Sequence, residues 1–97
     1  MVRAKDILEN TKTAILADAI SFVSIVDVDA KVNLEGAIML YIKTSNLQTI
    51  EVDSLKRLEN RYSTSRIKVE VLIPSTKFID GKHVENTDSV NIFIKEQ

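Results

Sequence analysis

The clearest pattern of apolar and polar residues lies between Ser21 and Thr44. From Phe22 to Leu34 most even positions are apolar and the odd positions are mainly polar, which predicts a half-buried strand. The run Ala37–Ile42 is apolar on both faces and predicts a second strand near the centre of a sheet. Because Gly36 lies between the two runs, we expect a long hairpin here.

Two segments have the three- and four-residue apolar spacing that is typical of amphipathic helices. The first runs from about Arg3 to Ala19, with a buried stripe of Ile7, Leu8, Thr11, Ile15 and Ala19. The second is predicted to run from a capping box at 45–48 to about Tyr62, with Leu47 and Ile50 closing its start. Its buried stripe is expected to be Val52, Leu55, Leu58 and Tyr62, and its solvent face Lys56, Arg57, Glu59 and Arg61.

Two further strands are predicted in the second half of the chain. Residues 66–73 are apolar at every odd position and carry Arg66, Lys68 and Glu70 on the other face, which predicts a strand that Pro74 ends. The last strand is expected over Ser89–Lys95. Residues 77–85 lie between these two strands and are here called the arm. The dipeptide Asp80-Gly81 predicts a tight hairpin turn within the arm.

The resulting fold class is α+β: a two-layer sandwich in the order α-β-β-α-β-β, with a mainly antiparallel sheet and one domain over 1–97. The sheet face away from the helices is also partly apolar, which favours a protein partner, in the simplest case a second copy of the chain. The arm adds two apolar residues to this predicted interface. The expected interface residues are Val23, Ile25, Met39, Tyr41, Leu72, Phe78, Ile79 and Phe93.

Composition restricts the function classes. The 97 residues are 44% hydrophobic and 28% charged, and the formal net charge of -1 gives no overall attraction to nucleic acid or anionic membrane. The absence of cysteine excludes disulfides and thiolate sites and fits a reducing, cytoplasmic location. No signal-peptide run or stretch of about 18 apolar residues is present, so no membrane association is expected.

One segment is locally basic. Residues 56–68 carry one acidic side chain, Glu59, and five basic ones, Lys56, Arg57, Arg61, Arg66 and Lys68. Such a cluster on a helix and the next strand can bind phosphates, and with the arm it would form a nucleic-acid contact. A plain solvated surface, which is the favoured interpretation, explains the same residues.

Few residues are candidates for catalysis or metal binding. Asp27 and Asp29 project from one strand face and could bind a divalent cation with Glu35 or Asp53, although a solvated strand edge is the favoured interpretation. His83, the only histidine, supplies one ligand and is expected to be an exposed turn residue. With two glycines and no recognised catalytic spacing, the chain is predicted to be no enzyme and to hold no cofactor or metal.

Two families have a similar order of elements. The second half, from Asn60-Arg61-Tyr62 through Asp80-Gly81-Lys82 to Val90–Lys95, resembles the helix–strand–arm–strand half of the archaeal Alba chromatin proteins. That resemblance implies a dimer whose arms grip DNA, but here a helix comes first and no Lys-Lys pair occurs. The helix–strand–strand–helix–strand order also resembles the dimerising cytosolic domain of cation-diffusion transporters, without that family's metal ligands. Neither similarity rests on a diagnostic motif, and the chain is assigned to neither family.

The sequence therefore predicts a small non-enzymatic binding domain that acts as a homodimer or within a larger assembly. A nucleic-acid-binding protein that uses the 56–68 surface and the arm is the first alternative. A metal-responsive regulatory domain is the second.

Overall fold

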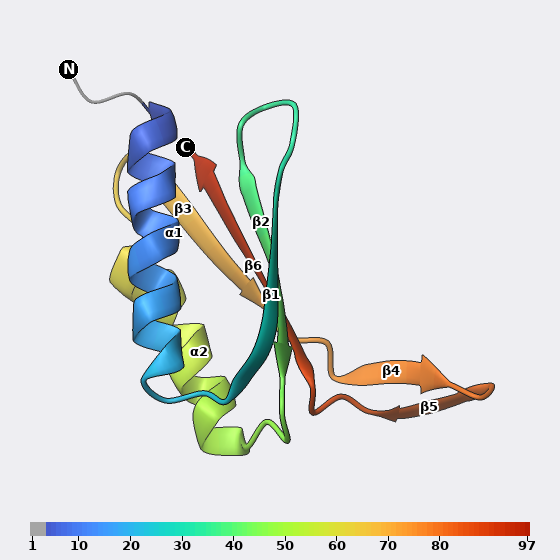
Figure 1. Cartoon of the computed structure of the whole chain (residues 1–97). Helices are drawn as coiled ribbons and strands as arrows, with labels where there is room; N and C mark the ends of the chain where they lie inside the picture. Colours follow the sequence, from blue (N-terminus) through green and yellow to red (C-terminus); the bar gives the residue numbers. More distant parts are fainter. Residues whose placement is uncertain (1–3) are drawn as a thin grey trace.

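Both helices lie on one side of a four-stranded antiparallel sheet, as the computed structural model shows for residues 4–97 (Figure 1). The elements are α1 (Ala4–Ile20), β1 (Ile25–Val32), β2 (Ile38–Thr44), α2 (Thr49–Tyr62), β3 (Ile67–Leu72), β4 (Thr76–Ile79), β5 (Lys82–Glu85) and β6 (Ser89–Glu96). The α+β class and the predicted order of helices and strands are confirmed, with β4 and β5 forming the arm.

The strand order of the sheet is β1-β2-β6-β3, so β1 and β3 are its edges. Leu40 of β2 pairs with Ile92 of β6, and Ile92 pairs in turn with Val71 of β3. Because paired residues of antiparallel strands point to the same side, these three side chains share the face toward the helices, here called the inner face. The opposite side is called the outer face.

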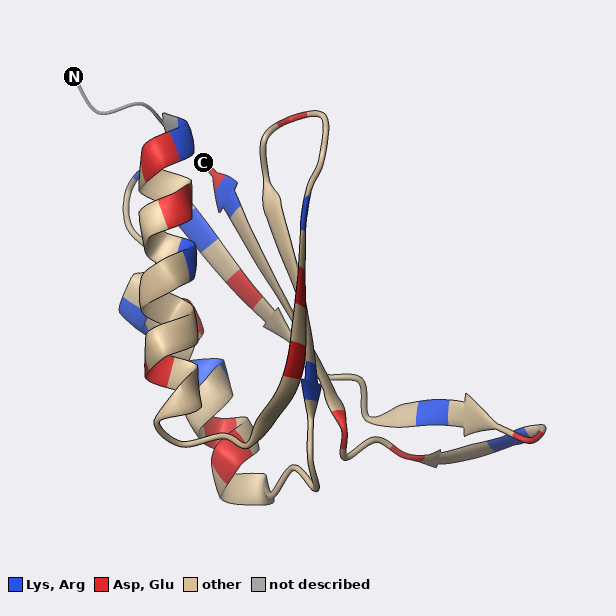
Figure 2. Cartoon of the chain, viewed as in Figure 1, with Lys and Arg blue, Asp and Glu red and all other residues tan. Residues whose placement is uncertain are grey.

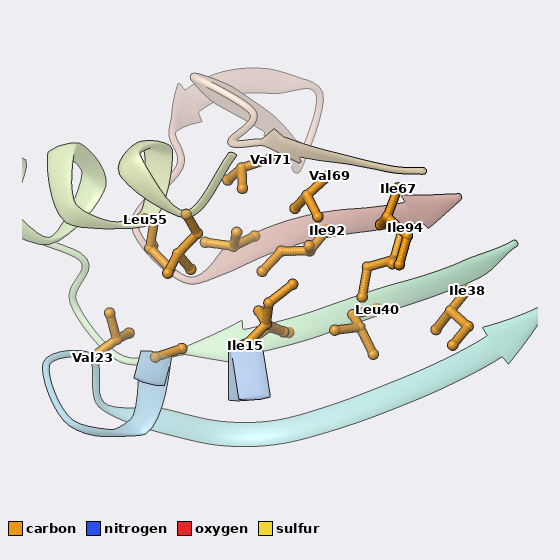
Figure 3. Packing of buried hydrophobic residues seen from close by; sticks show 14 of the residues in the cluster. Ile15, Val23, Ile38, Leu40, Leu55, Ile67, Val69, Val71, Ile92 and Ile94 are labelled. Carbon is orange, nitrogen blue, oxygen red and sulfur yellow. The ribbon is translucent and has the colours of Figure 1, made fainter. Parts of the chain in front are cut away.

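The hydrophobic core fills the space between the inner face and the two helices (Figure 3). The alternating positions of β2, β3 and β6 are buried there, together with Leu8, Ile15 and Ala19 of α1 and Leu55 and Leu58 of α2. The predicted helical stripes are thus confirmed at these positions, and Val52 and Tyr62 are half-buried beside them. In the described part of the chain, no helix is long and apolar enough to span a membrane.

The prediction that Val23 and Ile25 lie on the outer face is wrong. Val23 is 5% exposed and belongs to the core, while Ile25 packs against the core and pairs with buried Thr44. For Ile25 the physical reason is an irregularity between Ile25 and Asp27, which shifts the pairing by one position. A bulge of this kind reverses the faces of the residues before it, and leaves Val26 exposed although its even position predicts burial. Val23 lies before β1, in the turn after α1, where its N–H donates to Ala19 O at 2.9 Å.

The start of α2 also differs from the prediction. The helix begins at Thr49, and the N-cap Gln48 donates its backbone N–H to Glu51 Oε1 at 3.0 Å, so the capping box lies three residues later than expected. Leu47 is buried as predicted, but Ile50 is 75% exposed and does not cover the start of the helix.

The two helices are joined by polar contacts at Asp18. Its Oδ2 atom lies 2.6 Å from Arg61 Nη1 and accepts a 2.9 Å hydrogen bond from the Tyr62 hydroxyl. The Arg61 hydrogen bond, helped by that of Tyr62, holds the pKa of the Asp18 carboxyl below its usual value against the opposing effect of burial. Burial, followed by the bond to Asp18, raises the pKa of Tyr62.

The arm projects away from the sheet (Figure 1), and its two strands pair only with each other. Asp80 and Gly81 both have positive φ, 51° and 77°, which is the backbone of the tight hairpin turn predicted for this dipeptide. The base is fixed by buried Asn86, which donates its N–H to Ser75 O and its Nδ2 to Ser89 O.

Candidate interaction surface

The outer face carries apolar side chains at its centre. Met39 lies opposite Phe93 across β2 and β6, and in the next row Tyr41 and Leu72 flank Asn91. Leu72 is 52% exposed, Tyr41 is exposed, and Met39 and Phe93 are half-buried. The placement of Met39, Tyr41, Leu72 and Phe93 on this face is therefore as expected, and these four residues are called the outer-face cluster.

Charged residues surround the outer-face cluster. Glu70 lies in the same row as Phe93 and forms ion pairs with Lys68 at 3.2 Å and with Lys95 at 3.5 Å. These two ammonium groups, Lys68 first, lower the pKa of the Glu70 carboxyl. On the opposite side the Lys31 ammonium lies 5.6 Å from the centre of the Tyr41 ring, within the range of a cation–π contact.

The same face is hollowed beside the β1–β2 turn. The hollow has a volume of about 350 Å³ and is lined by Asn33, Glu35, Ala37, Met39, Glu70, Phe93 and Lys95. Its lining is thus partly apolar, and it also includes the carboxylates of Glu35 and Glu70 and the ammonium group of Lys95. The hollow is open to solvent and adjoins the outer-face cluster through Met39 and Phe93. The outer face is therefore concave at this end.

The arm presents the other two predicted interface residues. Phe78 is 65% exposed, Ile79 is also exposed, and neither contacts the main sheet through strand pairing. The centres of the Phe78 and His83 rings lie 5.1 Å apart, and the two rings pack edge to face. His83 is an exposed residue of β5. This places His83 on a strand rather than in the turn.

The five basic residues of 56–68 do not form one free cationic surface. Lys56 Nζ donates to Val71 O at 2.6 Å, Arg61 pairs with Asp18, and Lys68 pairs with Glu70. Arg57 and Arg66 are exposed and form no ion pair within residues 4–97. Figure 2 shows basic and acidic residues interspersed over the helices and strands. Lys56, Arg57 and Arg61 are exposed as predicted, although Lys56 and Arg61 also make intramolecular contacts, whereas Glu59 is half-buried and accepts a hydrogen bond from Val71 N–H.

The candidate metal ligands are dispersed. Asp27 and Asp29 both project from the outer face of β1, but Asp27 Oδ1 accepts a 2.9 Å hydrogen bond from Val28 N–H, and Asp29 lies 3.9 Å from Lys31 Nζ. Glu35 is in the β1–β2 turn and Asp53 is in α2. Among the described residues no group of three or more His, Asp or Glu side chains is arranged to hold a metal ion.

Sequence reasoning missed that α2 closes the free edge of β3. Val71 donates its N–H to Glu59 Oε2 at 2.9 Å and its carbonyl accepts from Lys56; Val69 bonds Ser63 Oγ through its N–H at 3.0 Å. Ile67 completes the edge by donating to Thr64 Oγ1 and accepting from Thr64 N–H. The signal in the sequence is the spacing of Lys56 and Glu59, one turn apart on a helix, with the hydroxyl of Ser63 directly after the helix and before the strand.

Comparison with models of protein families, with curated proteins and with solved structures finds no match to this chain. The resemblances drawn from the sequence therefore remain similarities in the order of elements.

Proposed function

We propose that this chain is a small non-enzymatic binding domain that associates with a second copy of itself through the outer face of its sheet. The observation that carries the proposal is the outer-face cluster, which lies at the centre of a sheet whose helices all cover the other side. Apolar surface gains roughly 25 cal/mol per Å² on leaving water, and an apolar patch on an open sheet is typical of a contact surface.

The distribution of charge supports the same proposal. A cluster of Met, Tyr, Leu and Phe surrounded by the Glu70–Lys68–Lys95 ion pairs has the apolar centre and polar rim that protein interfaces commonly have. The exposed arm residues Phe78 and Ile79 provide a second apolar contact, suited to reaching across to the partner. Such a domain would act in the cytoplasm, in accord with a sequence that has no cysteine.

A matched pair of substitutions tests this role. Leu72→Glu adds a charge to the outer-face cluster, and Ile50→Glu adds the same charge at an even more exposed apolar residue on α2. We expect Leu72→Glu to weaken association at least tenfold in sedimentation equilibrium, and Ile50→Glu to leave it unchanged. Equal association of the wild type and Leu72→Glu, with both folded by circular dichroism, would exclude the outer face as the contact.

Nucleic-acid binding is a weaker proposal, because three of the five basic residues make intramolecular contacts. It predicts salt-sensitive retention of DNA or RNA that is lost in the triple variant Arg57→Ala, Arg61→Ala, Arg66→Ala. An unchanged mobility shift in the triple variant would remove it. A metal-responsive role, the weakest, predicts a melting shift with zinc or calcium that Asp27→Asn and Asp29→Asn abolish.

A further inference from the structure

The two edges of the sheet differ in what their backbone groups contact. The outward N–H and C=O groups of β3 are bonded to α2 and the loop after it, as described above. On β1 the outward groups can be identified from Asn33, whose N–H bonds Ala37 O in the ladder to β2. Because ladder bonds alternate along an antiparallel pair, Val28, Ala30 and Val32 direct their backbone groups away from the sheet.

The β1 edge is open. The Val28 N–H is bonded to the neighbouring Asp27 carboxylate, but the outward groups of Ala30 and Val32 have no partner among residues 4–97. An eight-residue edge strand with free donors and acceptors is a template for pairing with another strand. The β3 edge of this sheet is thus closed by side chains, and the β1 edge is free to pair with another strand.

The inner face of β1 is also uncovered at Ala30 and Val32, although Ile25 and Val28 nearer its start pack against the core. α1 packs mainly against β6 and β2, and α2 packs against β3. Between the start of α1 and the end of β1 lies a hollow of about 320 Å³ that is lined by Leu8, Glu9 and Val32 among others. As a result Val32 is 62% exposed and Ala30 is exposed, although both point to the side that is apolar in the other strands. A neighbouring strand with apolar residues on the same side would cover them.

The charges of β1 are self-complementary in one antiparallel register. With Ala30 opposite the partner's Ala30, the inner face brings Val28 beside the partner's Val32, and the outer face brings Asp29 beside the partner's Lys31. Sliding the pair by one step that preserves the faces either places Asp29 against the partner's Asp29, with Asp27 beside the partner's Lys31, or places Lys31 against the partner's Lys31; only the register centred on Ala30 has opposite-charge pairs and no like-charge pair. Like charges directly opposite each other destabilise a strand pair, so the first register is selected. Figure 2 shows these acidic and basic positions along β1.

We propose that β1 pairs with β1 of a second copy across a two-fold axis at Ala30, so that the two sheets become one continuous antiparallel sheet. This contact goes beyond the proposed function, because it uses the strand edge and not the outer face. A two-fold axis at this position makes the contact closed and self-limiting. Either contact alone gives a dimer, and both together give a larger assembly.

The edge is tested in the Leu72→Glu variant, where the outer-face contact is removed. Asp29 and Lys31 are well exposed, with side chains 64% and 63% accessible, so their exchange does not threaten the fold. We expect Asp29→Lys or Lys31→Asp alone to weaken the remaining dimer about tenfold, and the double exchange to restore it to within about threefold. A dimer equally stable in all four proteins overturns the proposal.

Amide hydrogen exchange gives an independent measurement. The Ala30 and Val32 amides should become protected as the Leu72→Glu protein dimerises with rising concentration, and Ala30→Pro, which removes an outward donor, should abolish that dimer. Fast exchange of these two amides at all concentrations overturns self-pairing. Protection that is unaffected by exchange of the Asp29 and Lys31 charges also overturns it, and indicates that a strand other than the partner's β1 covers the edge. If Leu72→Glu leaves the wild-type mass unchanged while single charge reversal lowers it, the outer-face proposal fails and the edge proposal stands.

Discussion

The Glu59 carboxylate accepts a hydrogen bond of 2.9 Å from the backbone N–H of Val71, and through this bond α2 closes the outer edge of β3. The neighbouring Lys56 ammonium donates to the carbonyl of the same residue at 2.6 Å. Two side chains one helical turn apart thus satisfy both backbone groups of one edge residue. This arrangement blocks pairing of another strand with β3, so β1 is the open edge of the four-stranded sheet.

Glu59→Ala should lower the free energy of unfolding by about 1–3 kcal/mol, because the half-buried Val71 N–H loses its acceptor. Glu59→Gln keeps a carbonyl oxygen at the same place and should lose less. Urea unfolding of the two variants and the wild type measures the difference. Equal stabilities for Glu59→Ala and Glu59→Gln would show that the hydrogen bond does not stabilise the edge.

Thr44→Val should raise the free energy of unfolding by about 1 kcal/mol. The Thr44 hydroxyl is buried and has no hydrogen-bond partner among the described residues, so its removal relieves the cost of taking a polar group out of water. Valine has nearly the same shape and suits a strand. Thr44→Ser, which keeps the hydroxyl and loses the methyl group, is the control and should destabilise; a loss of stability in Thr44→Val would mean that the hydroxyl is satisfied.

Acid should weaken the fold partly through Asp18. Its pKa in the folded state is lowered, chiefly by the Arg61 hydrogen bond, so its contribution is present above the unfolded pKa of about 3.9 and is lost as pH falls through the folded value. In urea titrations between about pH 7 and pH 2.5, we expect the stability of Asp18→Asn to fall less steeply than that of the wild type, and the two to converge at low pH. Arg61 is exposed, so the effect is modest. Parallel curves would remove Asp18 from the account.

The elements of this fold could be predicted from the sequence where their signal is carried by their own residues. The stripe of Leu8, Ile15 and Ala19 identifies α1 because a helix repeats every 3.6 residues, and Asp80-Gly81 identifies the arm turn because both residues need positive φ. The outer-face positions of Met39, Tyr41, Leu72 and Phe93 followed from strand alternation, which holds where the ladder is regular.

The failures have a common physical cause, which is tertiary contact. The irregularity at Ile25–Asp27 reverses the face of Ile25, and nothing in the alternating pattern marks it. Val23 is buried from the turn after α1, where strand alternation does not apply. Lys56 and Glu59 occupy helical positions that are ordinarily solvated, and only the nearby edge of β3 makes them structural. The open edge at β1 likewise depends on which strands the helices cover.

The central claim is that this chain associates with itself, and the mass of the wild-type protein in solution tests it most directly. Sedimentation equilibrium across a dilution series that reaches low micromolar concentration should give at least twice the mass of one chain. A stable, folded protein that keeps the mass of a single chain at every concentration would contradict both the outer-face contact and the β1 edge contact.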